Sequence, residues 1–412
     1  MGHLGSCGDA DEAAEIAAIY LHCPFCFHKC HYCDFYSISD GPSAGDRQAA
    51  FIDRLEDELE FRAGQYRLRP RTIFVGGGTP TFLRPELLRK LFGKLGDLGA
   101  FNWVAEFTVE ANPETVTPEV ARILASAGVN RVSVGCQSFE PALLKALERW
   151  HEPASVARTI DQVRGVGITN INLDLIFAIP GQTMAMLDAD LDAALALSPT
   201  HLSCYGLTYE PNTAMTRRLQ LGQFRRAPEQ LERDMYARIM ARLDHAGFEH
   251  YEISSWARRD KGQGRRGEGA NDPGPQPSTL NPSPLRCQHN MIYWTNSDWI
   301  GFGPSAASHV RGHRWKNDPH LGRYLAQSPQ PPTVDHECLP RSRRTGEILM
   351  LALRLRDGVR LDWLKRHLSV DDVRYRVIDD LIEMNLLERI DTQVRLSNEG
   401  LFVADAVIER LL

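Results

Sequence analysis

The sequence lacks a long apolar run, a surplus of basic residues and an apolar leader. No stretch approaches the roughly 20 apolar residues that a membrane-spanning helix needs. Residues 1–16 are acidic and rich in small side chains, unlike a secretory signal peptide, so we expect a cytoplasmic protein with at most peripheral membrane contact. The formal net charge of −6 disfavours nucleic acid as a partner, because surfaces that bind phosphate backbones are basic.

The cysteines also lack the pattern of a disulfide scaffold. There are nine of them, and four fall between Cys23 and Cys33 while the other five are scattered. Secreted scaffolds instead carry an even number of cysteines for pairing. In a cytosolic chain such clustering is typical of a metal or iron–sulfur site.

Six short apolar runs alternate with amphipathic helical patterns in the first half of the chain. The expected strands are Ala17–Cys23, Thr72–Gly76, Ala105–Ala111, Arg131–Ser138, Ile171–Ile179 and Leu202–Tyr209. The helical patterns between them include Gln48–Arg62, Arg84–Leu95, Pro118–Ala127 and Ala142–Glu148. This alternation predicts an α/β fold in which helices cover a parallel sheet, either open or rolled into a barrel.

Unusual residues follow directly after several of these strands. Cys26–Cys33 follows the first strand and Gly76–Pro80 the second, while Glu110 lies at the end of the third. Gln137 ends the fourth strand, and Asp174 lies within the fifth. Because parallel α/β folds bind ligands at the carboxyl ends of their strands, we expect these residues to share one site.

Composition divides the chain into five segments. We expect a flexible tail at 1–16, a core domain at 17–256, a flexible insertion at 257–288, a segment completing the core at 289–336 and a small winged-helix-like domain at 337–412. The insertion is rich in Gly, Pro, Arg, Asn and Ser and has few apolar anchors. From 340 to 412 there are thirteen basic and thirteen acidic residues, which disfavours DNA binding and favours an interaction or lid module.

The clustered cysteines have the spacing Cys26-x3-Cys30-x2-Cys33. One short loop can direct three thiolates at a cuboidal cluster and leave its fourth iron open. Structural zinc fits less well, because its cysteines come in two separated pairs, and a redox dithiol leaves the third cysteine unexplained. Cys23 is either a fourth ligand, which would suit electron transfer, or a buried residue that ends the first strand; we expect the latter.

This spacing, followed by GGGTP at 76–80, resembles the radical S-adenosylmethionine (SAM) superfamily. Residues 20–37 (YLHCPFCFHKCHYCDFYS) resemble more closely the HemN/HemW family of oxygen-independent coproporphyrinogen III dehydrogenases and haem chaperones. The likeness continues through 74–81, 108–114, 130–139, 172–183, 202–213 and the C-terminal region. It implies a partial (β/α)6 TIM-like radical SAM barrel with a small C-terminal domain, a 4Fe–4S cluster on the three cysteines and SAM on the open iron.

The resemblance also implies a set of SAM-contacting residues: Tyr20, Tyr32, Gly77, Gly78, Thr79, Glu110, Gln137, Arg149 and Asp174. The glycines allow a ligand to approach the backbone closely. Glu110 could accept hydrogen bonds from a ribose or hold an amine. Asp174 lies in an apolar run and therefore needs a partner, for which Arg149 is the candidate. No catalytic residue is assigned.

Two features favour the chaperones over the dehydrogenases. The dehydrogenase pattern has a further cysteine two residues after the third, where this chain has Phe35, and the chaperone pattern has an HNxxYW motif, which is present here at 289–294. His289 could ligate haem iron while Tyr293 and Trp294 offer flat surfaces to the porphyrin. His309 and His313 are rival ligands. The chain departs from the family at Ala307, where a histidine is usual.

Three functions are therefore expected in order of preference. The first is a haem chaperone that delivers haem to apo-haemoproteins such as membrane respiratory enzymes, with a reductant such as flavodoxin or NADH. The second is oxidative decarboxylation of coproporphyrinogen III to protoporphyrinogen IX. The third is electron transfer through an iron–sulfur cluster held by all four clustered cysteines. Whether the chain is an enzyme, and whether it cleaves SAM, stays open.

Overall fold

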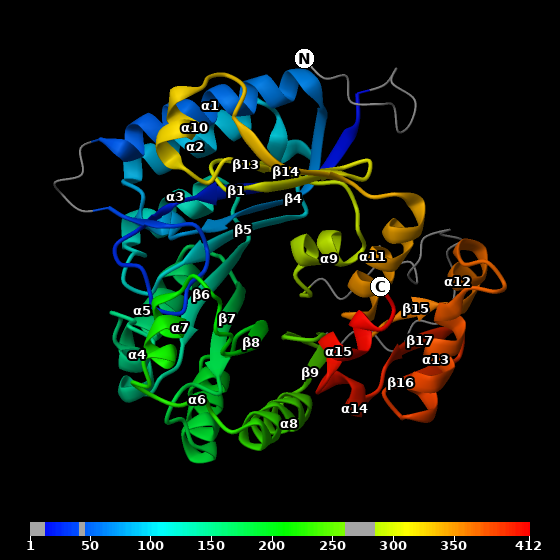
Figure 1. The fold of residues 1–412 in the computed structure, drawn as a ribbon. Coiled ribbons are helices and arrows are strands. Elements are labelled where there is room, and N and C mark those ends of the chain that lie inside the picture. Colours follow the sequence, from blue (N-terminus) through cyan, green and yellow to red (C-terminus); the bar gives the residue numbers. More distant parts are fainter. Residues whose placement is uncertain (1–12, 41–45, 260–284) are drawn as a thin grey trace.

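A computed structural model of the chain describes residues 13–40, 46–259 and 285–412. Its centre is a curved nine-stranded sheet with the order β11-β1-β4-β5-β6-β7-β8-β10-β9 (Figure 1). The strands are β1 (Glu15–Cys23), β4 (Arg67–Gly77), β5 (Glu106–Ala111), β6 (Arg131–Gln137), β7 (Asn170–Phe177), β8 (His201–Gly206), β9 (Phe248–Glu252), β10 (Ser255–Arg258) and β11 (Ile300–Phe302). The strands from β11 to β8 pair in parallel, and the β9–β10 hairpin adds antiparallel pairing at one end.

Helices cover the outer face of this sheet (Figure 1). They are α1 (Arg47–Gln65), α2 (Pro85–Asp97), α3 (Pro118–Ser126), α4 (Pro141–Ala146), α5 (Pro153–Gly165), α6 (Met184–Ala196) and α8 (Glu229–His245). The short α7 (Ala214–Gln220) instead lies against the cysteine loop, where the Met215 backbone N–H donates to the His31 carbonyl. The start of α3 shows how the sequence determines where a helix begins. Pro118 occupies the first turn of α3, where its missing N–H costs nothing, and Thr117 accepts a hydrogen bond from the Val120 backbone N–H.

Alternating side chains give the barrel an apolar outside and a polar inside. In β6, Val132, Val134 and Cys136 are fully buried in the core that packs against the helices. The alternate residues Arg131 and Ser133 line an internal cavity instead. Because neighbouring residues of a strand point to opposite faces, one strand supplies both the core and the wall of the cavity.

The six strands expected from the sequence are all present, so the predicted α/β fold with a parallel sheet is confirmed. Three details differ. β4 begins at Arg67, five residues earlier than expected, and the antiparallel hairpin of β9 and β10 extends the sheet beyond those six strands. β11 was not expected; it has only three residues, too few for a recognisable pattern, yet it forms the parallel edge beside β1.

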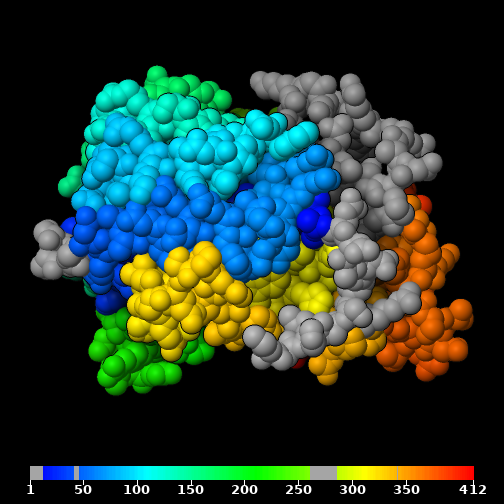
Figure 2. Space-filling model, turned by 90° about the horizontal axis from the view of Figure 1, so that it is seen from above, coloured from blue at the N-terminus to red at the C-terminus, as the bar shows by residue number. Residues whose placement is uncertain are grey.

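The segment after β11 returns to the first helix. A three-stranded sheet, with β12 (Ala307–Val310), β13 (His313–Asn317) and β14 (Thr333–Cys338), is joined to α10 (Leu321–Ala326), which lies against α1 (Figure 2). Glu58 of α1 is fully buried and accepts hydrogen bonds from the Gly303 backbone N–H, the Asn317 amide and the Tyr324 hydroxyl. This buried carboxylate ties the late segment to the start of the barrel.

The C-terminal part packs beside the open side of the barrel (Figure 1). It contains α11 (Arg341–Leu353), α12 (Leu361–His367), α13 (Val373–Glu383), α14 (Asn398–Leu401), α15 (Ala404–Glu409) and an antiparallel sheet of β15 (Val359–Arg360), β17 (Gln393–Leu396) and β16 (Leu387–Ile390). Arg286 joins it to the barrel through ion pairs with Glu249 (2.6 Å) and Asp357 (2.8 Å).

Two expected features fall largely outside the part of the chain that the structure describes: the N-terminal tail, of which 1–12 are not described, and the insertion, of which 260–284 are not described. The expected tail would have ended at 16, whereas β1 begins at Glu15. Across residues 13–40, 46–259 and 285–412, no helix has the length and apolar character to cross a membrane.

Candidate functional site

A cavity of about 1420 Å³ opens at the carboxyl ends of the barrel strands. Cys26, Cys30 and Cys33 all line it. Eight of the nine residues expected to contact SAM line it as well: Tyr32, Gly77, Gly78, Thr79, Glu110, Gln137, Arg149 and Asp174. The ninth, Tyr20, lines a smaller cavity of about 300 Å³ that lies within the barrel and shares Gly77, Glu110 and Asp174 with the large one. The fold therefore brings together segments that are up to 150 residues apart in sequence.

The cysteine loop is held by backbone hydrogen bonds and by two side-chain donors. β2 (Phe25–Cys26) pairs with β3 (Ile38–Ser39), which closes the base of the loop. The Thr79 hydroxyl lies 3.5 Å from the Cys26 sulfur, and the Arg149 guanidinium lies 3.6 Å from the Cys30 sulfur. Both groups donate hydrogen bonds, and a donor directed at sulfur stabilises a thiolate.

Burial nevertheless favours the protonated thiols in the free protein. It raises the pKa of Cys26, and it raises the pKa of Cys33 to about 11. A metal or cluster ligand must be a thiolate, so loading this loop has to displace protons. Cluster binding is therefore coupled to proton release.

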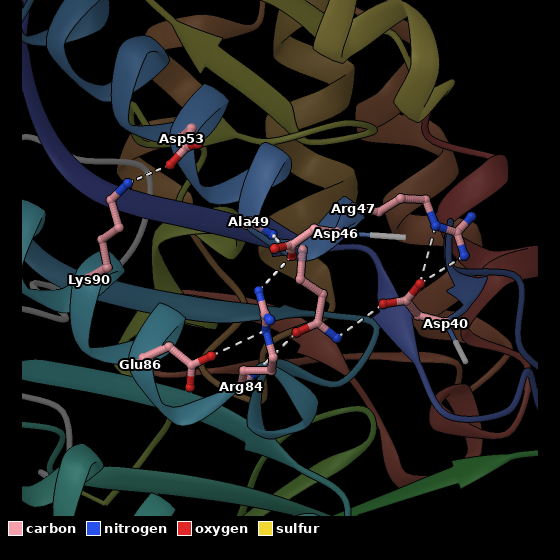
Figure 3. Close-up of polar contacts among 9 residues, drawn as sticks. Asp40, Asp46, Arg47, Ala49, Asp53, Arg84, Glu86 and Lys90 are labelled. Atoms are coloured by element: carbon pink, nitrogen blue, oxygen red, sulfur yellow. Dashed lines mark hydrogen bonds and ion pairs between the residues drawn. The ribbon is translucent and has the colours of Figure 1, made fainter. Parts of the chain in front are cut away.

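A polar network anchors the end of the cysteine loop to two helices (Figure 3). Asp40 is almost fully buried; its backbone N–H donates to the Cys26 carbonyl (3.0 Å), and its carboxylate accepts from Arg47 (2.8 Å) and Gln48 (3.1 Å). The Gln48 side-chain oxygen in turn accepts from the Arg84 backbone N–H (3.1 Å), just before α2. The Gln48 side chain thus connects the cysteine loop to the segment that follows the glycine run.

Cys23 lies in the core at the end of β1, 2% exposed. Burial raises the pKa of its thiol to about 12. It does not line the large cavity with the other three cysteines. The expectation that Cys23 is a packed strand residue is confirmed.

The packing of the protein itself requires glycine at positions 76, 77 and 78. A Cβ on Gly76 would lie 2.7 Å from the Glu110 carboxylate, and one on Gly78 would lie 2.7 Å from the Cys23 carbonyl. Gly77 has a φ of 99°, which side-chain-bearing residues rarely adopt, and a Cβ there would collide with the His22 ring. The run therefore lets the cysteine loop pack directly on the end of β4.

Glu110 is a carboxylate in the cavity wall whose pKa is strongly raised. Its Oε2 accepts a hydrogen bond from the Gly77 backbone N–H at 3.0 Å. Burial, together with the negative charge of Asp174 nearby, raises the pKa of Glu110 to about 7. A cationic ligand beside it would reverse this effect and favour the ionised form.

Asp174 does not have the partner that its sequence context suggested. Its carboxylate accepts hydrogen bonds from the Ser133 hydroxyl (3.1 Å) and the Asn172 amide (2.8 Å). Arg149 instead donates to the Gly135 carbonyl and to the cysteine loop, so the expected Arg149–Asp174 pair is wrong. The alternation of polar and apolar residues along Arg131–Gln137 and Asn170–Phe177 could have identified Ser133 and Asn172 as inward-facing partners.

Two further features at the cavity were not anticipated. Gln137, at the end of β6, has a φ of 64°, a left-handed conformation that is uncommon for a residue with a side chain. Trp150 is 66% exposed at the rim; its ring makes an edge contact with Phe27 and a tilted contact with His28 of the cysteine loop. An exposed tryptophan gives no signal in a sequence, because the residue is also common in cores.

The residues of the HNxxYW motif lie on α9 (Gln288–Trp294), inside the open side of the barrel (Figure 1). Its first turn is capped by Glu106 of β5, which accepts from the Gln288 and His289 backbone N–H groups (2.9 and 3.0 Å). His289 and Tyr293 face the smaller cavity. Trp294 instead packs with a separate cluster that includes Tyr251, so the three expected haem-binding side chains do not share one face.

His289 is fully buried and both of its ring nitrogens are hydrogen-bonded. Nδ1 lies 2.8 Å from the Thr72 hydroxyl and Nε2 lies 2.8 Å from the Tyr293 hydroxyl. Burial and the positive charge of Arg131 lower the pKa of His289 to about 3, so the ring is neutral. Of the rival histidines, His309 is buried with Nδ1 near the Ser297 carbonyl (3.1 Å), and His313 begins β13.

The donor set of the large cavity fits a cuboidal cluster. Three thiols from one loop face it, with hydrogen-bond donors at two of the sulfurs. Among the described residues, no three His, Cys, Asp or Glu side chains converge on a position for a single metal ion. Thiolates without imidazole are the ligand type that iron–sulfur clusters use.

Comparison with known proteins gives consistent matches along the chain. Residues 20–194 match the Radical SAM superfamily, and residues 339–403 match the HemN C-terminal domain. The chain is 32% identical to "Heme chaperone HemW" of Lactococcus lactis over 95% of this chain and 96% of that protein, and 33% identical to "Heme chaperone HemW" of Bacillus subtilis over 95% and 98%. The structure of coproporphyrinogen III oxidase (HemN) from Escherichia coli, a radical SAM enzyme, superposes with a TM-score of 0.76 at 20% identity, covering 97% of this chain and 90% of that one.

Proposed function

Because the chain belongs to the HemW family within the radical SAM superfamily, we propose that it binds haem and delivers it to proteins that require haem. The observation that carries this proposal is the match to curated haem chaperones over nearly the whole length of both chains. A match of that extent includes the barrel and the C-terminal domain. The proposal therefore concerns the whole protein.

The cofactors of this function are a 4Fe–4S cluster on Cys26, Cys30 and Cys33, and SAM. The superfamily implies both, and the large cavity supports them, because the three thiols face it beside the residues expected to contact SAM. When bound, these cofactors supply one-electron reductive chemistry at the sulfonium of SAM. No residue of the chain is assigned a catalytic role.

The chain's own residues would bind and orient SAM. Glu110 and Asp174 are partly buried carboxylates in the cavity wall that suit the amine and the ribose hydroxyls of a cationic nucleoside ligand. Arg149 is close to the Cys30 sulfur and would compensate the negative charge of a loaded loop. Tyr20, Tyr32, Gly77, Gly78, Thr79 and Gln137 complete the proposed contacts.

Oxidation of coproporphyrinogen III is less well supported. The structural likeness to HemN at 20% identity establishes a common fold and leaves the reaction open. Phe35, which is 64% exposed, stands where the dehydrogenase pattern has a cysteine. Electron transfer through four cysteines is disfavoured by the burial of Cys23.

The proposal also includes the proteins that receive haem and the reductant that supplies electrons to the cluster. Membrane respiratory enzymes are our proposed recipients, reached by peripheral contact with the membrane, and flavodoxin or NADH is the proposed reductant. These partners follow from the haem-delivery role, since delivered haem must reach apo-proteins and a reducing cluster must be supplied with electrons.

The test uses the full chain after anaerobic reconstitution of the cluster. Ferric haem is titrated and followed by its Soret absorbance, and coproporphyrinogen III is then offered with SAM and a reductant. We expect haem uptake without formation of protoporphyrinogen IX. Turnover of coproporphyrinogen by a protein that takes up no haem would replace the chaperone assignment with the dehydrogenase.

A further inference from the structure

One segment of the chain carries several positive charges and no negative charge. Residues 211–227, which we call the arginine segment, contain four arginines and no Asp or Glu, although the whole chain has a formal net charge of −6. The segment consists of α7 and the turns on either side of it. Within the part of the chain that the structure describes, none of its four arginines forms an ion pair. Its positive charge is therefore not compensated by bound carboxylates.

The arginine segment presents these charges to solvent around an apolar side chain. Arg217, Arg225 and Arg226 are exposed, and Leu221 between them is 65% exposed. The Arg226 guanidinium lies over the Tyr209 ring at 4.5 Å, which supports it at the surface. Protein interfaces commonly combine an apolar centre with a polar rim and are enriched in arginine. The segment thus has the composition of a docking surface for an acidic protein.

The inner side of the arginine segment touches the cysteine loop (Figure 1). The Met215 backbone N–H donates to the His31 carbonyl at 2.9 Å, and the Arg218 guanidinium lies 3.0 Å from His31 Nδ1. His31 directly follows Cys30, and Tyr32 packs in the same apolar cluster as Met215. No residue of the segment lines the large cavity. A protein bound to the segment would therefore reach the outside of the cysteine loop and leave the mouth of the cavity free.

We propose that the arginine segment is the docking surface for an acidic one-electron carrier protein of the flavodoxin kind, which reduces the cluster on the cysteine loop. This inference rests on the proposed function, because it requires that cluster. In the step, the carrier is oxidised by one electron and the cluster is reduced by one electron, and no covalent bond forms or breaks. Contact with the cysteine loop favours a carrier over an anionic membrane, since electron delivery requires proximity to the thiols and membrane attachment does not.

The test follows electron delivery to the full, cluster-loaded chain from flavodoxin that has been reduced in advance. With Arg217→Gln, Arg225→Gln and Arg226→Gln combined, the second-order rate of cluster reduction at low ionic strength should decrease about 10-fold, because electrostatic steering is lost. At about 1 M salt the difference from wild type should shrink to less than about 2-fold, since salt screens exposed charges. Leu221→Ser should slow reduction about 2- to 5-fold at both salt concentrations. Calorimetry with oxidised flavodoxin should show weaker binding by both variants.

A matched control removes three positive charges elsewhere on the surface. Arg71 of β4, Arg122 of α3 and Arg376 of α13 are also exposed, and their combined replacement by Gln should leave the rate and the flavodoxin affinity at wild-type values. Both triple variants should retain the iron content and the electron paramagnetic resonance spectrum of the dithionite-reduced wild type, which shows that the cluster site is intact. Equal slowing in the two triple variants, or a wild-type rate in the first, would overturn the proposal.

Two further measurements separate this inference from its alternatives. If the first triple variant no longer binds vesicles containing phosphatidylglycerol but is reduced by flavodoxin at the wild-type rate, the arginine segment is a membrane-binding surface and the inference is wrong. If the wild type takes up no haem, the proposed function itself fails. If the wild type takes up haem and flavodoxin reduces the first triple variant as fast as wild type, only the docking surface is refuted.

Discussion

Replacing Glu110 with glutamine should stabilise the protein at pH 8 and have little effect at pH 5. Burial and Asp174 raise the pKa of Glu110 to about 7 from an ordinary value of 4.5. A carboxyl group whose pKa is raised by folding favours the folded state while it is protonated, and that contribution is lost as the pH rises from about 4.5 through 7. Above pH 7 the folded protein therefore contains a buried carboxylate that weakens it.

The size of this effect follows from the two pKa values. Each pKa unit corresponds to about 1.4 kcal/mol, so the gap between 4.5 and about 7 corresponds to about 3 kcal/mol. Glutamine cannot ionise, and its side-chain oxygen can still accept the hydrogen bond from the Gly77 backbone N–H. The free energy of unfolding should thus increase by about 2 to 3 kcal/mol at pH 8 in Glu110→Gln, with a much smaller change at pH 5.

Urea unfolding of cluster-free protein at the two pH values measures this difference. The control is Glu119→Gln, an exposed glutamate paired with Arg89 on neighbouring helices, for which a change of less than about 0.5 kcal/mol is expected at either pH. In the cluster-loaded protein the same Glu110 variant should bind SAM more weakly than wild type, because the cation loses its carboxylate. Equal stability changes at pH 5 and pH 8 would refute the reasoning.

Three further predictions concern the cluster and the C-terminal domain. Cys30→Ser should lose the four-iron cluster, whereas Cys23→Ala should keep it; iron analysis after anaerobic reconstitution decides, and iron loss in Cys23→Ala would contradict the packing role of that residue. Arg286→Met should lower the free energy of unfolding by about 2 kcal/mol, because two partly exposed carboxylates lose their shared cation, and high salt should reduce that effect in urea unfolding. Trp363→Ala should lower the free energy of unfolding by about 3 to 5 kcal/mol, since the ring is 2% exposed and its removal leaves a cavity. A decrease below about 1 kcal/mol in the same measurement would show that neighbouring side chains move in to fill this cavity.

The parts of the fold that a sequence reveals are those with local signals. The six barrel strands were recognisable because each is an apolar run between helical patterns, and their polar endings predicted one shared cavity. β11 was not, since three residues form no pattern and the partner of the strand is far away in sequence. Pairing between distant segments depends on tertiary structure, which local periodicity does not encode.

The candidate site shows the same division. The cysteine spacing and the glycine run predicted the position of the cavity correctly. The predicted partner of Asp174 was wrong, because the sequence does not reveal the pairing register of the strands, which determines the residues that lie beside Asp174. In the structure, Gly135 of β6 is the register partner of Asp174, which places Ser133 two residues away on the same inward face. The orientation of Trp294 away from His289 follows from helical geometry, because residues five apart on a helix do not share a face as residues four apart do.

The pairing of β1 with β11 has a consequence for how the protein is made. Leu21 and Phe302 are register partners although about 280 residues separate them, and chains grow at about 5–20 residues per second. The strand that leads into the cysteine loop therefore keeps one edge unpaired for about 15 to 55 s after its own synthesis. During that interval the cysteine loop is attached to a sheet whose edge strand still lacks its partner.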